Sequence, residues 1–202
     1  MSKQLGFYFD AGRCVQCHAC EVACKSTHEL ELGPRWRRVL DRWAGKFPLV
    51  VNTSLSVSCM HCADPACAKV CPVTAISKRK EDGVVVVDSE ECIGCRACRK
   101  ACPYGAPQYG HNGKMQKCYL CTDRIALGLQ PSCVATCPGE ALAFGDVEEL
   151  AKLAAARGGE KMEGVTRPSL FVIPAKNVAN ISIEFHSFFQ ELHPGRTPSA
   201  QE

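Results

Sequence analysis

Hydrophobic and polar positions alternate only over short stretches of this chain, and they predict short elements. The apolar run at 84–87, directly after Gly83, predicts a strand. The charged turn at 78–82 before it makes a hairpin there plausible. Apolar residues at alternate positions within 49–57 predict further strands, in a segment (29–58) that contains no cysteine.

Helical patterns occur twice. Residues 123–128 predict a short helix that a glycine ends. Residues 146–156 predict a longer helix capped by Asp146. Its apolar face would consist of Val147, Leu150, Leu153 and Ala154. The apolar run at 171–173, which Pro174 follows, predicts a short edge strand.

No apolar run approaches the ~18 residues that a membrane-spanning helix needs. No basic stretch followed by an apolar one precedes the first cysteine. We therefore expect neither a transmembrane segment nor a secretory signal in this chain. Export would then depend on a partner that carries a twin-arginine signal.

The sixteen cysteines fall into four groups of four, with none left over. Each group opens with C-x-x-C and closes with C-x-x-x-C, and a proline directly follows the last three groups. This spacing is typical of cubane 4Fe–4S sites, and sixteen thiolates are enough for four clusters. The groups are Cys14, Cys17, Cys20 and Cys24; Cys59, Cys62, Cys67 and Cys71; Cys92, Cys95, Cys98 and Cys102; and Cys118, Cys121, Cys133 and Cys137.

Two other uses of cysteine are less consistent with this pattern. Disulfide scaffolds are usually short secreted chains, whereas this chain has 202 residues. Structural zinc sites use C-x-x-C pairs that lie further apart, because adjacent pairs would compete for one ion. A structural or regulatory zinc protein without a redox role stays open as an alternative, and it would be colourless.

In two-cluster ferredoxins the fourth cysteine of a group binds the other cluster. We expect a helix to carry that thiolate in its first turn. The second and third groups are close in sequence and form one pair, which leaves the first and fourth groups to pair with each other. The predicted ligands are Cys14, Cys17, Cys20 and Cys137 (cluster 1); Cys24, Cys118, Cys121 and Cys133 (cluster 2); Cys59, Cys62, Cys67 and Cys102 (cluster 3); and Cys71, Cys92, Cys95 and Cys98 (cluster 4).

This pairing inserts one bacterial-ferredoxin-like module in another and predicts an α+β fold with short hairpins, short helices and cluster-centred cores. A repeat supports it, because 71–76 resembles 137–142 and 102–106 is a partial third copy. Aromatic residues are only 7% of the chain, so we expect little conventional core and a largely unfolded chain without clusters. The predicted units are 1–58, the first half of module A plus a hairpin insertion; 59–110, module B; 111–145, the second half of module A; and 146–202, a C-terminal extension of helix, strand and tail.

The formal charge of +3 would suggest an anionic partner. Four oxidised cubanes carry about −2 each, however, so the loaded protein would carry roughly −5. Basic residues are spread along the chain, which argues against nucleic-acid binding. We interpret two basic groups mainly as local charge compensation and solvated surface: Arg35, Arg37 and Arg38; and Arg96, Arg99 and Lys100.

Some residues outside the cysteine groups have two interpretations. The segment 29–58, with Trp36 and Trp43, is either a hairpin that closes a cluster against water or a docking surface. His18 and His61 lie inside cysteine loops and could tune a cluster through hydrogen bonds. Three residues near the end either face a partner or pack back on the modules: Phe185, Phe188 and Phe189. We expect a disordered tail at 197–202 and no catalytic residues.

Several stretches resemble one family specifically. They are 6–10 with the pair Arg13 and Cys14, then 59–67, 92–96 and 101–109. The chain resembles the four-cluster iron–sulfur subunits of the molybdopterin oxidoreductase superfamily, and it is most similar to the electron-transfer subunit of dimethyl sulfoxide reductase. The resemblance covers about residues 5 to 145.

The resemblance implies a non-catalytic electron-transfer subunit of an anaerobic respiratory complex. Its partners would be a catalytic subunit with molybdenum or tungsten on two pterins, and a membrane anchor that reacts with quinones. Cluster 1 would lie nearest the catalytic subunit and cluster 4 nearest the anchor. Nitrate reductase relatives replace the residue at Cys95 with tryptophan, so the cysteine here implies four cubanes.

The resemblance also implies a peripheral membrane complex. It would lie on the periplasmic face if co-exported with a twin-arginine partner, and otherwise in the cytoplasm. The alternative function is a polyferredoxin subunit of a hydrogenase or formate–hydrogen lyase complex, which would copurify with nickel–iron enzymes.

Overall fold

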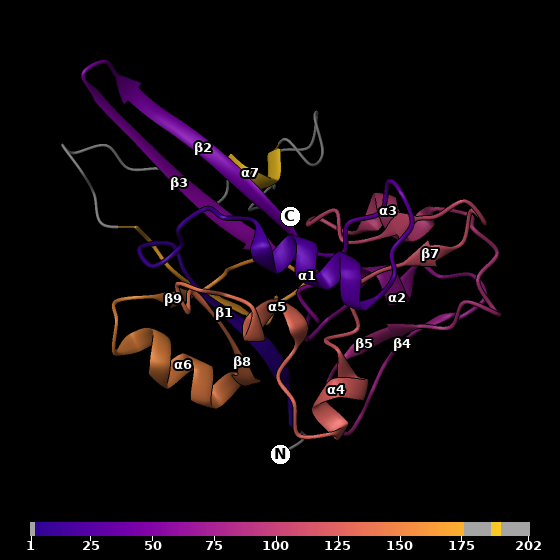
Figure 1. Cartoon of the computed structure of the whole chain (residues 1–202). Helices are drawn as coiled ribbons and strands as arrows, with labels where there is room; N and C mark the ends of the chain where they lie inside the picture. Colours follow the sequence, from indigo (N-terminus) through magenta and orange to yellow (C-terminus); the bar gives the residue numbers. More distant parts are fainter. Residues whose placement is uncertain (1–2, 176–186, 191–202) are drawn as a thin grey trace.

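Strands and helices are short throughout the computed structural model, which describes residues 3–175 and 187–190. Within these residues the strands form one four-stranded sheet and three two-stranded sheets. Figure 1 shows the larger sheet on one side of the molecule, a long hairpin projecting from the body, and the small hairpins on the other side. The mixture of short helices and small sheets agrees with the expected α+β class.

The larger sheet consists of β1 (Leu5–Asp10), β8 (Leu142–Asp146), β9 (Glu160–Lys161) and β10 (Leu170–Ile173). Its order is β8–β1–β10–β9, with β1 parallel to β10 and antiparallel to β8. All six residues of β1 are buried. Because strand side chains alternate between faces, Tyr8 packs in one core while Phe7 and Phe9 pack in another, beside the cysteine loops.

Helix α6 (Val147–Ala155) covers one face of this sheet. It begins at the predicted cap, since Asp146 Oδ1 accepts a 2.9 Å hydrogen bond from the Glu148 amide. Leu150 and Ala154 are buried as expected, whereas Leu153 is 41% exposed. The core under the helix contains Tyr8, Leu150, Ala154, Phe171 and Ile173. The expectation of little conventional core is therefore wrong for this part of the chain.

Strand β10 is not an edge strand, contrary to the prediction. It lies between β1 and β9, and all four of its residues are buried. Pro174 directly follows Ile173, the last paired residue, so its missing N–H does not interrupt the ladder. The C-terminal segment is thus part of the sheet that β1 begins.

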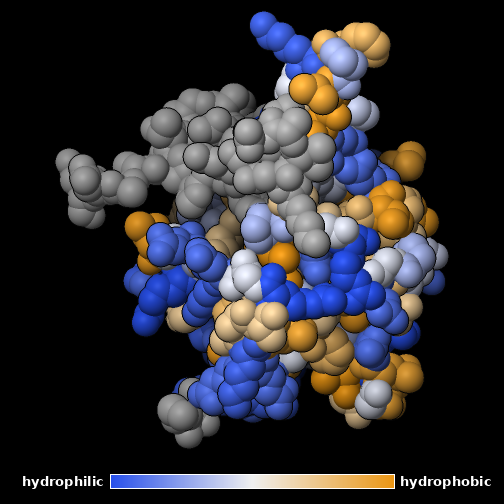
Figure 2. All heavy atoms as spheres, turned by 90° about the vertical axis from the view of Figure 1, so that its left-hand side faces the viewer, coloured by the Kyte–Doolittle hydropathy of each residue, from blue (hydrophilic) through white to orange (hydrophobic). Residues whose placement is uncertain are grey.

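The long hairpin is formed by β2 (Arg38–Lys46) and β3 (Leu49–Val57), paired from Arg38 and Val57 to Lys46 and Leu49. Its base is buried, including Leu55 and Val57. Its tip projects from the body, where Phe47 is 92% exposed. Figure 2 shows hydrophobic and hydrophilic side chains mixed on this projecting tip, which lies at the top of that view. The predicted strands in 49–57 are thus confirmed as one continuous strand.

The remaining elements surround the cysteines. The hairpin predicted at 78–87 is present as β4 (Ile76–Lys78) with β5 (Val85–Val87), and β6 (Gln108–Tyr109) pairs with β7 (Met115–Gln116). The helix predicted at 123–128 is present as α4. The short helices are α1 (Ala19–Thr27), α2 (Ala66–Lys69), α3 (Ala97–Ala101), α4 (Thr122–Ala126), α5 (Ser132–Ala135) and α7 (Ser187–Gln190).

Two of the three C-terminal phenylalanines pack back on the body. Phe188 and Phe189 of α7 are buried, and the Phe189 ring meets Tyr104 edge-on at 5.4 Å. Phe185 and the tail at 197–202 lie outside the described residues. Among the helices that are described, none is both long and apolar enough to cross a bilayer.

Candidate iron–sulfur site

Each cysteine group starts with the same backbone turn. The residue before the second cysteine is left-handed in all four groups, with φ of 58° at Gln16, 41° at His61, 67° at Gly94 and 63° at Leu120. Such a residue turns the chain sharply within the C-x-x-C segment. Only Gly94 has the residue type that announces this conformation in a sequence.

The third cysteine of every group is the second residue of a helix. These are Cys20 in α1, Cys67 in α2, Cys98 in α3 and Cys133 in α5. Three of the four helices have only four or five residues, so the fourth cysteine lies at or beyond their ends. The expectation that the first turn carries the fourth thiolate is therefore wrong, because that turn carries the third.

The loops after the fourth cysteine repeat as well. The third residue after it is left-handed in the three proline-containing groups, with φ of 53° at Thr74, 60° at Gly105 and 47° at Glu140. In the last group the amide that directly follows this turn, that of Ala141, donates a 3.3 Å hydrogen bond to Cys137 Sγ. The sequence repeat is thus also a repeat of backbone conformation.

Two open cavities bring together thiols from different groups. One is lined by Cys14, Cys17, Cys20 and Cys137. The other is lined by Cys71, Cys92, Cys95 and Cys98. Each cavity therefore combines three cysteines of one group with the fourth cysteine of another. None of the sixteen cysteines forms a disulfide.

The other cysteines form two mostly buried sets with the same crossing. Cys24 lies near Cys121 and Cys133, and Cys118 lies near Cys24 and Cys133. Cys102 lies near Cys59, as Cys62 and Cys67 do. Among the described residues, no three His, Cys, Asp or Glu side chains are grouped as ligands of a single metal ion.

Burial determines the acidity of these thiols. Burial first, and nearby cysteines second, raise the pKa of Cys24, Cys62 and Cys67 to about 12 and that of Cys102 to about 11. These cysteines are therefore protonated at neutral pH unless a cation replaces the proton. Because a bound cluster requires thiolates, loading must release protons, and a lower pH must oppose it.

Backbone amides donate hydrogen bonds to some of the cysteine sulfurs, as expected of residues that bind such a cluster. The Leu120 amide donates to Cys118 Sγ, and the Met115 amide donates to Cys92 Sγ, each at 3.3 Å. Hydrogen bonds of this kind stabilise charge on a thiolate. Thiols that line one cavity, together with amide donors, match what 4Fe–4S clusters need from a protein.

Several side chains near the thiols could not be found from the sequence. His28 Nε2 lies 3.3 Å from Cys121 Sγ, and the Tyr109 hydroxyl lies 3.1 Å from Cys98 Sγ.

The two histidines singled out in the sequence make other contacts. His18, which lies inside a cysteine loop, contacts Asp41 at 3.1 Å. His61 Nδ1 accepts a 3.1 Å hydrogen bond from the Val85 amide, and burial lowers its pKa well below the usual range.

The two basic groups of the sequence differ in burial. Arg37 and Arg38 are buried, so the expectation of solvated surface is wrong for them. Arg35 is more exposed and pairs with Glu21 at 2.7 Å. Arg96, Arg99 and Lys100 are exposed, as expected. The amino-acid composition of the two basic groups does not predict which of them is buried, because burial depends on contacts with residues far away in the chain.

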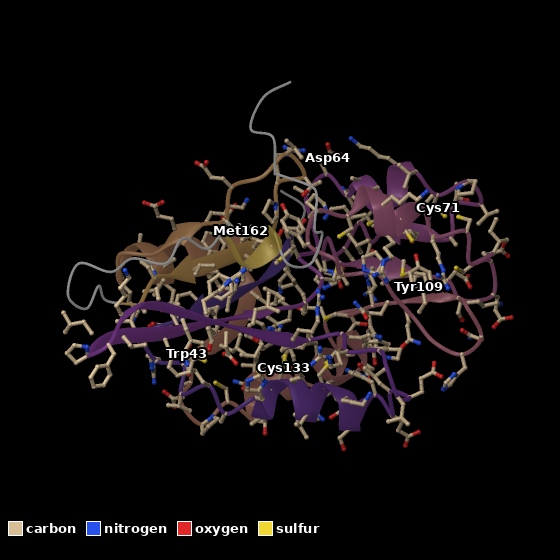
Figure 3. The ribbon with its side chains drawn as sticks, turned by 90° about the horizontal axis from the view of Figure 1, so that it is seen from above. Trp43, Asp64, Cys71, Tyr109, Cys133 and Met162 are labelled. Carbon is tan, nitrogen blue, oxygen red and sulfur yellow. The ribbon has the colours of Figure 1, made fainter. Side chains whose placement is uncertain are left out.

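The two tryptophans of segment 29–58 agree with different interpretations of it: Trp36 with a hairpin that closes a cluster against water, and Trp43 with a docking surface. Trp36 is partly buried and donates a 2.9 Å hydrogen bond to Gln116, next to the rings of His28 and Tyr119. Trp43 is 71% exposed on β2. In Figure 3, Trp43 lies toward one end of the molecule and Cys71 and Tyr109 toward the other, with Cys133 between them.

Comparisons with known proteins agree on iron–sulfur binding. A family model described as a 4Fe-4S dicluster domain matches residues 50–147, and one described as a 4Fe-4S binding domain matches residues 11–27. Over 161 residues, the chain is 48% identical to the iron–sulfur subunit of the anaerobic dimethyl sulfoxide reductase of Escherichia coli (strain K12), covering 75% of this chain and 78% of that protein.

Two further relatives belong to other oxidoreductases. The chain is 41% identical to the formate dehydrogenase iron-sulfur subunit of Wolinella succinogenes over 170 residues, which cover 71% of this chain and 82% of that protein. It is 36% identical to a subunit of the sulfite dehydrogenase of Allochromatium vinosum over 201 residues, which cover 86% and 84%. The similarity therefore extends across enzymes with different substrates.

Proposed function

The chain belongs to the family of iron–sulfur subunits that includes the one of anaerobic dimethyl sulfoxide reductase, and we propose that it relays electrons between a quinone-linked membrane anchor and a molybdenum or tungsten bispterin catalytic subunit. It binds 4Fe–4S clusters, and its sixteen cysteines are enough for four. When bound, each cubane gains or loses one electron at a time. The chain itself, in this proposal, carries no catalytic residues.

The observation that carries the proposal is the crossing of cysteine groups at the two open cavities. We assign Cys14, Cys17, Cys20 and Cys137 to cluster 1 and Cys71, Cys92, Cys95 and Cys98 to cluster 4, in agreement with the cavity linings. We assign Cys24, Cys118, Cys121 and Cys133 to cluster 2, and Cys59, Cys62, Cys67 and Cys102 to cluster 3, and the neighbours of Cys24, Cys67 and Cys102 support this assignment. Shared groups link cluster 1 to cluster 2 and cluster 3 to cluster 4. Cys118 of cluster 2 lies near Cys59 of cluster 3, so in this proposal an electron can pass along one path.

The same crossing supports an inserted module. In this proposal 59–110 is a ferredoxin module between two halves, 1–58 and 111–145, of a second module. Strand β1, before the first cysteine group, pairs with β8, after the fourth group. The two halves of the outer module are therefore joined at their ends, while 146–202 contributes α6, β9 and β10 to the sheet.

The exposed ends of the path are the proposed contacts with partners. Cys17 and Cys95 are exposed, so electrons can enter or leave there without crossing the protein. We place the catalytic subunit at the Cys17 end. The hairpin is fixed there by hydrogen bonds from Asn52 to Gln16, at 2.6 Å, and between His18 and Asp41, at 3.1 Å. The anchor would then cover the Cys95 end of a peripheral membrane complex, periplasmic if a partner carries a twin-arginine signal and otherwise cytoplasmic.

Elemental analysis of the native complex tests this function. The complex would be isolated anaerobically on a tag fused to this chain. We expect about sixteen iron atoms per chain for four cubanes, plus iron, and molybdenum or tungsten, from the catalytic subunit. Iron with nickel would instead support the polyferredoxin alternative. Zinc without iron would refute electron transfer.

A further inference from the structure

Within the described part of the chain, the two most deeply buried cations lie among the cysteine sets without a carboxylate partner. The exposed fraction of both Arg37 and Lys117 is 2%. Within residues 3–175 and 187–190, the hydrogen-bond acceptors of both side chains are hydroxyl and carbonyl oxygens. A buried charge is costly unless an opposite charge lies nearby. These two residues therefore need anionic neighbours other than Asp or Glu.

Arg37 is held between the ligands proposed for clusters 1 and 2. Its Nη1 and Nη2 atoms donate 3.1 Å hydrogen bonds to the hydroxyls of Ser56 and Ser58. The Ser56 hydroxyl in turn lies 3.5 Å from Cys20 Sγ, a proposed ligand of cluster 1. The backbone of Arg37 lies beside the thiol of Cys24, a proposed ligand of cluster 2, and helps to lower its pKa. Its position is therefore fixed from both sides.

The charge of Arg37 is stabilised by sulfur. Burial alone would lower the pKa of Arg37, but the surrounding cysteines, in the thiolate form that a cluster requires, outweigh burial and raise it. These sulfurs belong to Cys133, Cys20, Cys118 and Cys24. The guanidinium also lies 4.4 Å from the centre of the Phe7 ring, which packs it on the side of β1.

Lys117 occupies a similar place beside the ligands proposed for cluster 3. Its Nζ atom donates to the Val85 carbonyl, and to the Cys118 carbonyl at 3.0 Å. Its charge lowers the pKa of Cys67, against the larger effect of burial. The cluster 4 cavity differs, because the Arg96 beside it is exposed and lies over Tyr109.

We propose that Arg37 and Lys117 are fixed positive charges that raise reduction potentials, Arg37 those of clusters 1 and 2 and Lys117 that of cluster 3. The inference rests on the proposed function and its ligand assignment. Reduction adds one negative charge to a cubane, supplied by a neighbouring cluster or by an external reductant. A cation that stays in place stabilises the reduced form more than the oxidised form, without any proton transfer.

Redox titration of the complex, followed by electron paramagnetic resonance, tests the proposal. Arg37→Gln should lower the potentials of clusters 1 and 2 by about 59 mV or more, a tenfold change for a one-electron couple. Arg37→Lys, which keeps the charge, should restore most of the shift. Lys117→Met should shift cluster 3 most. Arg157→Gln is the matched control, since that arginine pairs with Asp10 at 3.0 Å on the sheet side, and it should shift none.

The outcomes separate charge from structure. Unchanged potentials in a fully loaded Arg37→Gln complex would overturn the proposal. Loss of clusters in both Arg37 variants would overturn it too, because shape and not charge would then be required. Loss in Arg37→Gln alone, with Arg37→Lys loaded normally, would support it. A wild-type complex without cubane signals would refute the proposed function itself, before any variant is compared.

Discussion

The two exposed cysteine loops have the same local structure and different surroundings. Val15 and Ile93 occupy equivalent positions and are each 63% exposed, and Cys17 and Cys95 follow them. The first loop is backed by the four-stranded sheet and the long hairpin. The second is backed by the two small hairpins and a smaller core.

The local structure of the loops therefore determines what they bind, and the elements behind them determine what they contact. The turn conformation and the helix after it are shared, so they specify the kind of site. The elements behind the loops are not shared. They should therefore determine how far each end depends on its cluster for folding, and which partner it meets.

Removal of iron should reveal the largest difference between the two ends of the molecule. Chelation under anaerobic conditions should increase amide hydrogen exchange in β4 and β5 on the order of a thousandfold or more, because their core depends on cluster ligands. Exchange in β1 and β10 should increase much less, because α6 covers them. Reconstitution with iron and sulfide is the control. Equal exchange in both regions would mean that the sheet also needs the clusters.

Substitution of a fourth cysteine should identify the end to which it belongs. Cys137→Ser should remove the same paramagnetic signal as Cys17→Ser, although Cys137 belongs to the fourth group. Quinol-linked turnover should fall on the order of 100-fold or more. The matched variant is Cys121→Ser, which changes the same group and should remove the cluster 2 signal. If Cys137→Ser matched Cys121→Ser, the crossed assignment would be wrong.

The sequence predicts the local chemistry well because ligand spacing is a local property. The cysteine groups, the hairpin at 76–87 and the Asp146 cap all follow from residues close together in the chain. The contacts of Arg37 do not, since Ser56 and Ser58 follow about twenty residues later. The central place of β10 is also a long-range property, because its partner β1 is at the other end of the chain.

Backbone conformation gives a second example. The left-handed turn is predictable at Gly94, where glycine removes the steric cost of a positive φ. Gln16, His61 and Leu120 adopt it without that signal. They can be found only by aligning the four cysteine groups with one another, which makes the internal repeat more informative than any single loop.

The exposed part of the long hairpin should contribute to binding of the catalytic subunit at the Cys17 end. Trp43→Ser with Leu49→Ser should weaken binding of the catalytic subunit about 10- to 100-fold, because exposed aromatic anchors often contribute about 1–3 kcal/mol to an interface. Iron content should not change. Titration calorimetry or a pull-down at graded concentrations measures the effect. Leu127→Ser, an exposed leucine after α4, is the control, and equal binding by all variants would exclude the hairpin from the interface.

The smallest expected effect concerns one hydroxyl at the Cys95 end. Tyr109→Phe removes the group that lies 3.1 Å from Cys98 Sγ. A thiolate can only accept this hydrogen bond, and the bond is weaker when the cluster is oxidised and less negative. Its loss should therefore lower the cluster 4 potential by ~40 mV, or about 1 kcal/mol.

The matched variant is Tyr119→Phe, whose hydroxyl reaches a thiol only through His28, at 3.2 Å from His28 Nδ1. It should change the cluster 2 potential less than Tyr109→Phe changes that of cluster 4, because one more bond separates it from sulfur. Equal shifts in the two variants would show that the rings act through packing. A shift confined to cluster 4 in Tyr109→Phe would show that a neutral hydroxyl donor tunes the potential at this end, where the described residues provide no buried cation.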